Sequence, residues 1–386
     1  MSEFNAVIDF GSNNLRIGVF DSQSKSIYSS KVSISDSLNN KDSNNYLNEL
    51  IRDAERHLSI HLENVKVLYD SSKFYSIDLS IKKKFDQPTI IKNHYDNLIE
   101  EANFIISQNN FKAQVLHIIV NNIIADNNKV EKLIDDVEIK SLTLEIKFIC
   151  LNKSLIDDIS NEFKKNNLIV SNIYCSSYVR SFFYKKKIEA KNDYIFLDIG
   201  YQRTCALFFN NEKFEFFNSI PIGGNNITKD ISKILKLNID YSEVLKINFN
   251  KNENELSFNK NVTNNNPFSE VLEKNISVDL LKQIIEARVN EIIELSVFQS
   301  DYVKQNKTLQ KPSIIFMGNG SKLLSKYYNF DLKKKFTELI FFEENDSMIC
   351  EAGLWYYLSD ESILTNAKKK SKKVGFFESF FNIFSK

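Results

Sequence analysis

Two segments far apart in the chain share one pattern of hydrophobic and polar positions. Residues 7–20 and residues 195–209 each place an apolar run on either side of a short polar turn that begins Asp-x-Gly. Apolar runs separated by such a turn are typical of two-stranded hairpins. The repetition of the pattern therefore predicts two similar hairpins, one in each half of the chain.

The two turns carry the residue types that a phosphate site uses. Asp9 and Gly11 open the first turn, and Asp198 and Gly200 open the second. Glycine allows a ligand to approach the backbone closely, turn amides can hold phosphate oxygens, and a carboxylate can hold hydrated Mg²⁺. Each turn alone could be an ordinary hairpin, but two facing copies would hold a nucleoside triphosphate from both sides.

Helices and strands alternate through the rest of the first half. Apolar residues at helical spacing predict helices over 47–58, 95–106 and 155–163. Apolar runs predict strands over 65–69, 74–81, 113–124, 142–151 and 168–173. The block from 65 to 149 mixes strands and a helix and is interpreted as a small inserted subdomain.

The second half contains two glycine-containing turns beyond the hairpin. Residues 219–230 predict a strand, a Gly-Gly turn and the start of a helix. Residues 312–321 predict a buried strand that runs into a glycine-rich turn, with a helix starting near Ser321. The free N–H groups of that helix could bind a phosphate. A long helix is predicted over 280–297, and the Asn-rich residues 247–268 are expected to be exposed.

The last residues form a second strong pattern. Five lysines lie within 368–373, and residues 374–386 follow with phenylalanines at helical spacing. An aromatic helix face beside lysines is typical of a helix that lies in the interface of an anionic membrane. The alternative is a terminal helix packed on the core of the protein. The expected membrane-binding residues are Phe376, Phe377, Phe380, Phe381, Ile383 and Phe384.

Composition removes several other function classes. The 386 residues hold 50 Lys and Arg against 50 Asp and Glu, so no overall positive field attracts nucleic acid. Four cysteines and four histidines are scattered without metal-site spacing, which fits a reducing cytoplasm. No apolar run is expected to act as a signal peptide or to cross a membrane.

These features, in this order, resemble the FtsA family of the actin-like ATPase superfamily. The resemblance implies an α/β actin-like fold of two lobes, in which a ribonuclease-H-like unit is duplicated. It also implies an FtsA-type inserted subdomain and a C-terminal amphipathic helix. It implies ATP and Mg²⁺ as ligands. The resemblance also implies a division of the chain. The first lobe would hold residues 1–64, 150–191 and 346–364, with the inserted subdomain at 65–149. The second lobe would hold 192–345, with an upper subdomain near 232–283, and would be followed by a basic linker at 365–373 and the membrane-targeting helix at 374–386.

The resemblance also assigns site residues. The phosphate-binding positions are Asp9, Gly11, Ser12, Asn13, Asn14, Asp198, Gly200, Tyr201, Gln202 and Thr204, with Asp9 and Asp198 holding Mg²⁺ mostly through water. The connecting segment holds Gly223, Gly224, Thr228 and Asp230, and Ala352 and Gly353 match the second connecting helix. The nucleoside would meet Arg288, Glu291, Gly318, Asn319, Gly320 and Ser321.

Three departures from the family pattern bear on catalysis. Asn14 stands where a basic residue is common, the second turn reads Gly-Tyr-Gln-Arg-Thr, and Asn319 replaces a glycine of the adenosine motif. Gln202 is the one candidate for positioning a water, and no general base is identified. The sequence thus implies nucleotide binding and at most slow ATP hydrolysis.

The implied biological role is structural. Members of this family form actin-like protofilaments, and this chain is expected to bind the C-terminal peptide of FtsZ through the upper part of its second lobe. It would tether FtsZ filaments to the cytoplasmic face of the inner membrane at the division septum. The inserted subdomain would recruit later division proteins, and nucleic acid is not an expected partner.

Two other readings remain open. Residues 9–16 also match the Asp-x-Gly-Ser-Asn-x-x-Arg pattern of exopolyphosphatases and guanosine-pentaphosphatases, although the second turn lacks the Gly-Gly-Gly-Ser of that family. A pilus-assembly relative of FtsA would also bind ATP as a scaffold but would usually lack the terminal helix. A carbohydrate kinase would need a catalytic Asp in a sugar cleft, which no motif marks.

Overall fold

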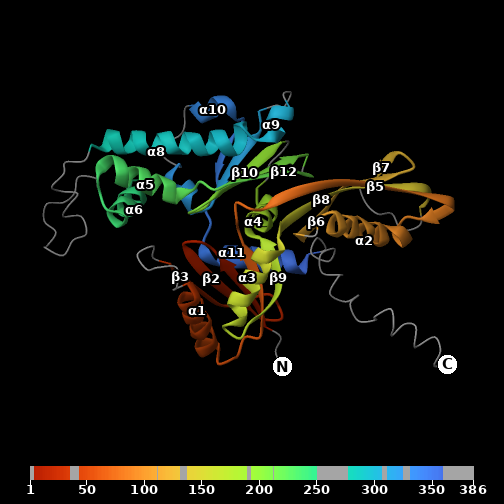
Figure 1. Cartoon of the computed structure of the whole chain (residues 1–386), viewed down its shortest axis with the longest axis horizontal. Helices are drawn as coiled ribbons and strands as arrows, with labels where there is room; N and C mark the ends of the chain where they lie inside the picture. The colour runs from red at the N-terminus through yellow and green to blue at the C-terminus, as the bar shows by residue number, and fades with distance from the viewer. Residues whose placement is uncertain are drawn as a thin grey trace.

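Three β-sheets organise the part of the chain that the structure, a computed structural model, describes. The described residues are 4–34, 43–110, 112–130, 137–188, 193–211, 213–249, 277–306, 311–324 and 331–359. Two sheets form the lower and upper lobes in Figure 1, and the third projects sideways from between them.

The first sheet has the order β3-β2-β1-β4-β9. Its strands are β1 (Asn5–Phe10), β2 (Asn14–Phe20), β3 (Ser26–Ser33), β4 (Asn64–Tyr69) and β9 (Ile169–Cys175). The first three pair antiparallel, and β4 and β9 continue the sheet in parallel. Four helices belong to this lobe, namely α1 (Ser43–Leu58), α3 (Lys153–Lys164), α4 (Ser176–Lys185) and α11 (Asp346–Leu358).

The second sheet repeats this topology, with the order β12-β11-β10-β13-β14. Its strands are β10 (Tyr194–Ile199), β11 (Thr204–Asn210), β12 (Lys213–Ile220), β13 (Ser313–Met317) and β14 (Leu339–Phe341). Again the first three pair antiparallel and the last two pair in parallel. The repeated hydrophobic pattern of the sequence therefore reflects a repeated sheet.

Helices lie above the second sheet and to its left in Figure 1. They are α5 (Gly224–Leu235), α6 (Ile239–Asn248), α8 (Val278–Ile293), α9 (Asp301–Gln305) and α10 (Asp331–Lys335). The long helix expected over 280–297 ends in a π-helical turn at Glu294–Phe298. The helix expected near Ser321 is instead a 3₁₀ turn, Asn319–Leu323, which corrects that prediction.

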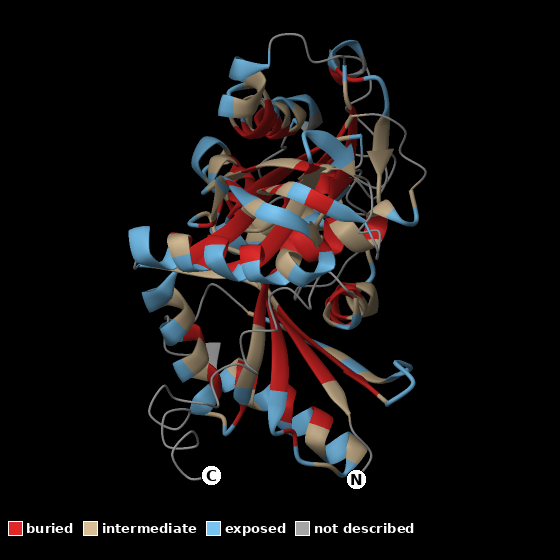
Figure 2. Ribbon diagram, turned by 90° about the vertical axis from the view of Figure 1, so that its right-hand side faces the viewer, coloured by how far each residue is buried: buried red, intermediate tan, exposed pale blue. Residues whose placement is uncertain are grey.

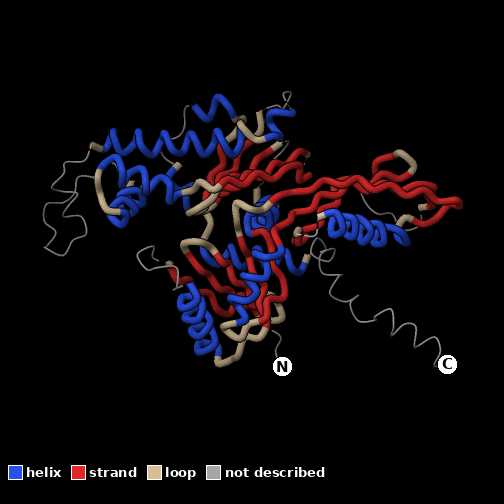
Figure 3. Tube along the Cα trace, viewed as in Figure 1, coloured by secondary structure: helices blue, strands red, loops and turns tan. Residues whose placement is uncertain are grey.

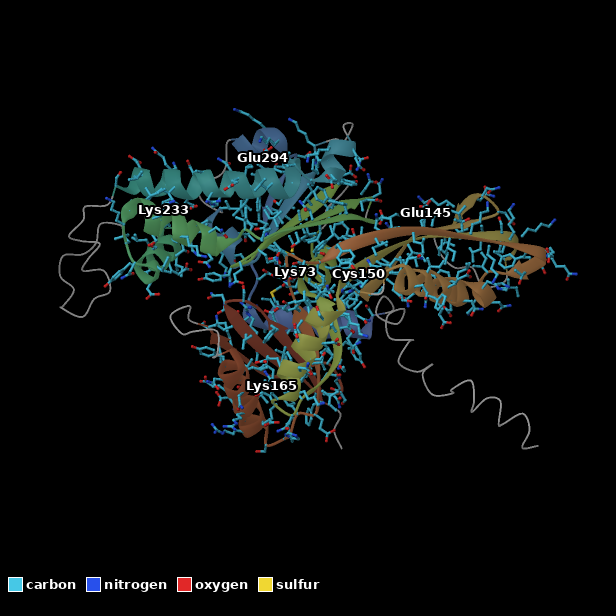
Figure 4. All side chains as sticks on the ribbon, viewed as in Figure 1. Lys73, Glu145, Cys150, Lys165, Lys233 and Glu294 are labelled. Atoms are coloured by element: carbon cyan, nitrogen blue, oxygen red, sulfur yellow. The ribbon has the colours of Figure 1, made fainter. Side chains whose placement is uncertain are left out.

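The third sheet has the order β5-β8-β6-β7 and lies, in the chain, between β4 and β9. It contains β5 (Tyr75–Ile90), β6 (Ala113–Ala125), β7 (Asn128–Val130) and β8 (Glu138–Asn152), all antiparallel, with α2 (Lys92–Asn109) packed on one face. Figure 3 shows these strands as a long arm. Cys150 lies where the arm meets the lobes, and Glu145 lies farther out (Figure 4). The strand expected over 74–81 is thus twice as long as its apolar run.

One apolar core is shared by the two lobes. Buried residues follow the strands of both sheets in Figure 2. One face of the second sheet packs with the first lobe through α4, where the rings of Tyr178 and Phe214 lie 5.2 Å apart in a T-shaped contact. The opposite face of the second sheet packs under α5 and α8. The strands of both hairpins therefore contribute to one apolar core at the boundary between the lobes.

A buried histidine fixes the arm to the first lobe. His117 on β6 is fully buried, and its Nε2 accepts a hydrogen bond from the backbone N–H of Cys175 at 2.9 Å. Because Nε2 accepts, Nδ1 carries the proton and donates to the Tyr356 hydroxyl at 2.9 Å. Burial lowers the pKa of His117 to about 3.

This histidine is expected to make stability depend on pH. The unfolded chain takes up a proton on the imidazole below about pH 6.5, whereas the folded protein does so only near pH 3. Stability should therefore fall between these values, by up to about 1.4 kcal/mol per pH unit. In urea unfolding from pH 7 to pH 4, His117→Gln should remove this slope. A stability difference between the two proteins that stays constant across that range would contradict the assignment.

Candidate functional site

The two Asp-x-Gly turns face one cavity between the lobes. The cavity has a volume of about 650 Å³, and both turns line it, together with the turn after β13. The sequence-predicted residues on its wall are Asp9, Gly11, Ser12, Asn13, Asn14, Asp198, Gly200, Tyr201, Gly224, Gly318, Asn319 and Gly320. The three glycine-containing turns, far apart in the sequence, thus meet at one place.

Other sequence-predicted residues do not line this cavity. They are Gln202, Thr204, Gly223, Thr228, Asp230, Arg288, Glu291 and Ser321. The Thr204 hydroxyl donates to the Ile222 carbonyl at 2.7 Å, and the Ser321 hydroxyl donates to the Gly318 carbonyl at 2.7 Å. Both hydroxyls thus stabilise the backbone of the turns through hydrogen bonds.

Arg288 and Glu291 lie on α8, away from the cavity wall. The Arg288 guanidinium donates two hydrogen bonds to Asp230 on α5, at 2.6 and 2.9 Å, and also contacts Glu291. This cluster ties α8 to α5. A nucleoside role for these residues remains a prediction, because the described cavity does not reach them.

The connecting segment is locked onto the second turn. The N–H of Gly224 donates to the Gly200 carbonyl at 2.9 Å, and the N–H of Asn225 donates to the Tyr201 carbonyl at 2.8 Å. A Cβ atom at Gly223 would lie 2.6 to 2.8 Å from three backbone atoms of the turn. Only glycine therefore allows this close packing, and the start of α5 reaches the cavity wall.

Gly318 places the third turn against the Asp198 side chain. Its φ of 83° is in the left-handed region that favours glycine, and a Cβ atom there would lie 2.3 Å from Asp198 Oδ1. The N–H of Gly318 donates to the Glu344 carboxylate at 2.6 Å. The turn after β13 is thus held by Glu344 and lies next to Asp198 of the second Asp-x-Gly turn.

A buried ionic cluster lies at the centre of the cavity wall, and we define the central cluster as Asp70, Arg180, Asp198, Arg203 and Glu344. Both guanidiniums contact the Asp198 carboxylate, with Arg203 Nη2 at 2.7 Å from Oδ2. Arg180 also donates to Glu344 at 2.8 Å, and Arg203 also contacts Asp70. The cluster spans both lobes, because Asp70 and Arg180 come from the first and Asp198 and Arg203 from the second.

Burial and charge act in opposite directions within the central cluster. Burial favours the neutral form of Asp198, but Arg180 and Arg203 outweigh it and lower its pKa. Burial raises the pKa of Asp70, with a further contribution from the Asp198 charge, because Arg203, Arg180 and the hydrogen bond from Ser177 do not compensate fully. The adjacent carboxylates raise the pKa of Arg180 and Arg203 in spite of burial, so both remain charged.

The first Asp-x-Gly turn has its own arginine. Arg16 on β2 is buried, and its Nη1 lies 2.7 Å from Asp9 Oδ2 while its Nε lies 2.5 Å from Asp346 Oδ1. Lys31 approaches the other oxygen of Asp346 at 2.8 Å. Each aspartate of the two motifs is therefore paired with at least one arginine.

Helix α6 contributes residues to the cavity wall that the sequence analysis did not predict. Lys246 is buried, and its ammonium donates to the Gly224 carbonyl at 3.0 Å and to Thr228 Oγ1 at 2.8 Å. Glu243 pairs with it at 2.5 Å. Thr228 thus acts within this network beneath the cavity wall.

The missed residues left different signals in the sequence. Asp70 directly follows the buried strand β4, a position from which a parallel strand presents side chains at the sheet edge. Arg16 and Arg203 lie inside the recognised hairpins. Arg180 lies on α4, a helix that the hydrophobic pattern of the sequence did not predict. No sequence signal therefore identified Arg180.

Comparison with known proteins agrees with this architecture. Residues 195–374 match the family model of the cell division protein FtsA. Cell division protein FtsA of Streptococcus pneumoniae is 28% identical over 128 residues, which span 33% of this chain and 27% of that relative. The aligned part is thus about a quarter of the relative's length.

Solved structures match over nearly the whole chain at low identity. The PilM-PilN type IV pilus biogenesis complex aligns with a TM-score of 0.58 and 10% identity, covering 92% of this chain and 97% of that one. MreB5 of Spiroplasma citri bound to ADP aligns with a TM-score of 0.49 and 11% identity, covering 95% and 98%. The matched second half is similar to the cell division protein FtsA, and the duplicated sheets and two lobes form an actin-like fold.

Proposed function

We propose that this chain is an ATP-binding cell-division protein that tethers FtsZ filaments to the cytoplasmic face of the inner membrane. One observation supports the proposed nucleotide binding: both Asp-x-Gly turns and the Gly-Asn-Gly turn line the same cavity. Its volume of about 650 Å³ suits a small-molecule ligand. The match to the cell division protein FtsA supports the division part.

The position of the cavity gives nucleotide a way to control the shape of the protein. Turns from both lobes line it, so a ligand that contacts both would favour the arrangement in which they are close. We infer that ATP stabilises a closed form that assembles into actin-like protofilaments. The inserted arm would contact later division proteins.

The membrane part rests on the sequence of the last residues. The basic linker 365–373 and the amphipathic segment 374–386 lie outside the described residues. Among the helices that the structure describes, none has the length and apolar character needed to cross a bilayer. Five phenylalanines on one helical face beside five lysines support binding at the surface of an anionic membrane instead.

A pilus-assembly scaffold is the second candidate. It is favoured by one observation, the fold similarity to the PilM-PilN complex across 92% of the chain. Against it stand the family match over residues 195–374 and the aromatic tail. In either case we expect a mainly structural role; Gln202, the candidate for positioning water, is not on the described cavity wall.

A negative charge at the first turn is expected to weaken ATP binding. Ser12 is exposed and lines the cavity between the two lobes. A glutamate there would face the phosphates, and like charges a few ångströms apart cost about 1–4 kcal/mol near a protein surface. We expect Ser12→Glu to raise the Kd for ATP by about tenfold or more in isothermal titration.

The control for this experiment is the same substitution at the other end of the same hairpin. Ser22 is exposed in the turn between β2 and β3 and is not on the cavity wall. Ser22→Glu should leave the Kd for ATP unchanged. Equal affinities for all three proteins would mean that the nucleotide does not bind at the first turn, and an absence of ATP binding by the unmodified protein would refute the nucleotide proposal.

A further inference from the structure

We propose that this cleft binds its nucleotide without a divalent cation, with arginine guanidiniums in the place of Mg²⁺. The inference rests on the proposed nucleotide function and concerns the same site. It departs from the sequence-based expectation that Asp9 and Asp198 hold Mg²⁺. The reason is that both carboxylates already have permanent cationic partners.

The first observation is the coordination of Asp198. Its Oδ2 accepts hydrogen bonds from the Ser177 hydroxyl at 2.7 Å and from both Arg180 and Arg203. The Asp198 side chain is 1% exposed, and Gly318 lies close to its other oxygen. Mg²⁺ needs near-octahedral oxygen ligands and keeps several waters. A carboxylate oxygen that already accepts from two guanidiniums and a hydroxyl does not fit as a ligand of hydrated Mg²⁺.

The second observation is that Asp9 is occupied in the same way. Arg16 pairs with its Oδ2 at 2.7 Å, and the Ser176 hydroxyl lies 3.3 Å from its Oδ1. The side chains of Asp9 and Arg16 are 10% and 8% exposed. A divalent ion would have to displace a guanidinium that cannot lose its proton. Within the described residues, no group of three or more His, Cys, Asp or Glu residues is arranged to hold a metal.

The third observation is the charge of the cavity wall. Its basic side chains are Arg16, Lys31, Arg180, Arg203, Lys246 and Lys322, and its acidic side chains are Asp9, Asp70, Asp198, Glu243 and Glu344. Six cationic groups against five anionic groups leave a net positive charge of one. Arg16, Arg180 and Arg203 are hydrogen-bonded to carboxylates. Their positive charges still act on phosphates in the cavity and can supply part of the charge compensation that Mg²⁺ would otherwise provide.

The consequence is a site built for binding rather than turnover. In enzymes that transfer phosphoryl groups, a metal ion neutralises the charge that develops on the transferred group. With both aspartates paired to arginines, ATP would act as a ligand that holds the lobes together. This chain would then respond to the concentration of ATP and not to that of Mg²⁺.

Calorimetric titration of ATP into the full-length protein tests the inference. The titration is run once with Mg²⁺ in excess and once with EDTA in place of the metal. We expect the two Kd values to agree within about threefold, which is less than 1 kcal/mol. Binding that weakens more than about tenfold in EDTA would overturn the inference and leave the nucleotide proposal standing. Absence of binding in both buffers would refute the nucleotide function itself, and the inference with it.

A charge-balanced variant provides the second arm. Arg203→Gln with Asp70→Asn removes one positive and one negative group from the central cluster and releases one of the two arginines from Asp198. We expect this protein to gain a dependence on Mg²⁺ of about tenfold. The matched control is Lys147→Gln with Asp78→Asn, an ion pair of 2.8 Å on the arm, which should behave like the unmodified protein. If the cluster variant stays independent of Mg²⁺, the arginines are not the groups that replace the metal, and the inference fails.

Discussion

Replacing Arg180 by methionine is expected to lower the free energy of unfolding by about 3–5 kcal/mol, the usual cost of removing one partner from a buried ion pair. Arg180 is 5% exposed and contacts Asp198, Glu344 and Asp70. Methionine would fill much of the space but leave these three carboxylates with Arg203 as their one arginine in the central cluster. Because the cluster spans both lobes, the loss should appear in urea unfolding of the whole protein.

Two controls separate this effect from the general effect of losing an arginine. Arg56→Met on α1 removes an exposed arginine 3.6 Å from Asp53, and such surface pairs contribute about 0–1 kcal/mol. Adding Glu344→Gln to Arg180→Met restores the original net charge of the central cluster and should recover part of the free energy of unfolding. A loss below about 1 kcal/mol for Arg180→Met would contradict the view that the cluster joins the lobes.

The hairpins and their turns could be predicted from the sequence because their signals are local. An apolar run, an Asp-x-Gly turn and a second apolar run specify strands and a bend without reference to distant residues, and the structure confirms both hairpins. The same holds for α1, where Leu47, Leu50 and Ala54 lie on one buried face. The domain boundaries that the family resemblance implies remain predictions.

The ion pairs of the site could not be predicted in this way because they depend on tertiary contacts. Arg180 and Glu344 are separated by 164 residues, and Arg203 and Asp70 by 133. No local pattern indicates which carboxylate an arginine will meet. Thr204 and Ser321 show the reverse case, because their motif positions indicated ligand contacts while their hydroxyls bind backbone carbonyls. Motif matching therefore identified turns that line one cavity, but it did not identify the partners of the charged groups there.

Replacing Phe377 and Phe380 by glutamate is expected to weaken membrane binding strongly. On a helical projection both residues lie within the aromatic face of the tail. Burying a phenylalanine side chain contributes about 1.5–3 kcal/mol when complete, so the loss of two should weaken lipid binding by well over tenfold. Flotation with vesicles that contain anionic lipid measures this directly.

The matched control adds the same two charges to the opposite face. Ser379→Glu with Asn382→Glu places both glutamates on the polar side of the projection. This protein should still float, though less well at low salt, because its aromatic face is intact and only the electrostatic attraction is reduced. If the two double variants float equally, the aromatic face is not the anchor and the tail packs elsewhere.

The central claim is that the chain joins FtsZ filaments to the membrane. Flotation of the full-length protein with anionic vesicles, ATP and FtsZ tests it most directly, beside a version that ends at Lys373. The account predicts that FtsZ floats with the full-length protein and stays at the bottom with the shortened one. If the full-length protein floats and FtsZ does not, the protein is a membrane-bound actin relative with a different partner, and the claim is contradicted.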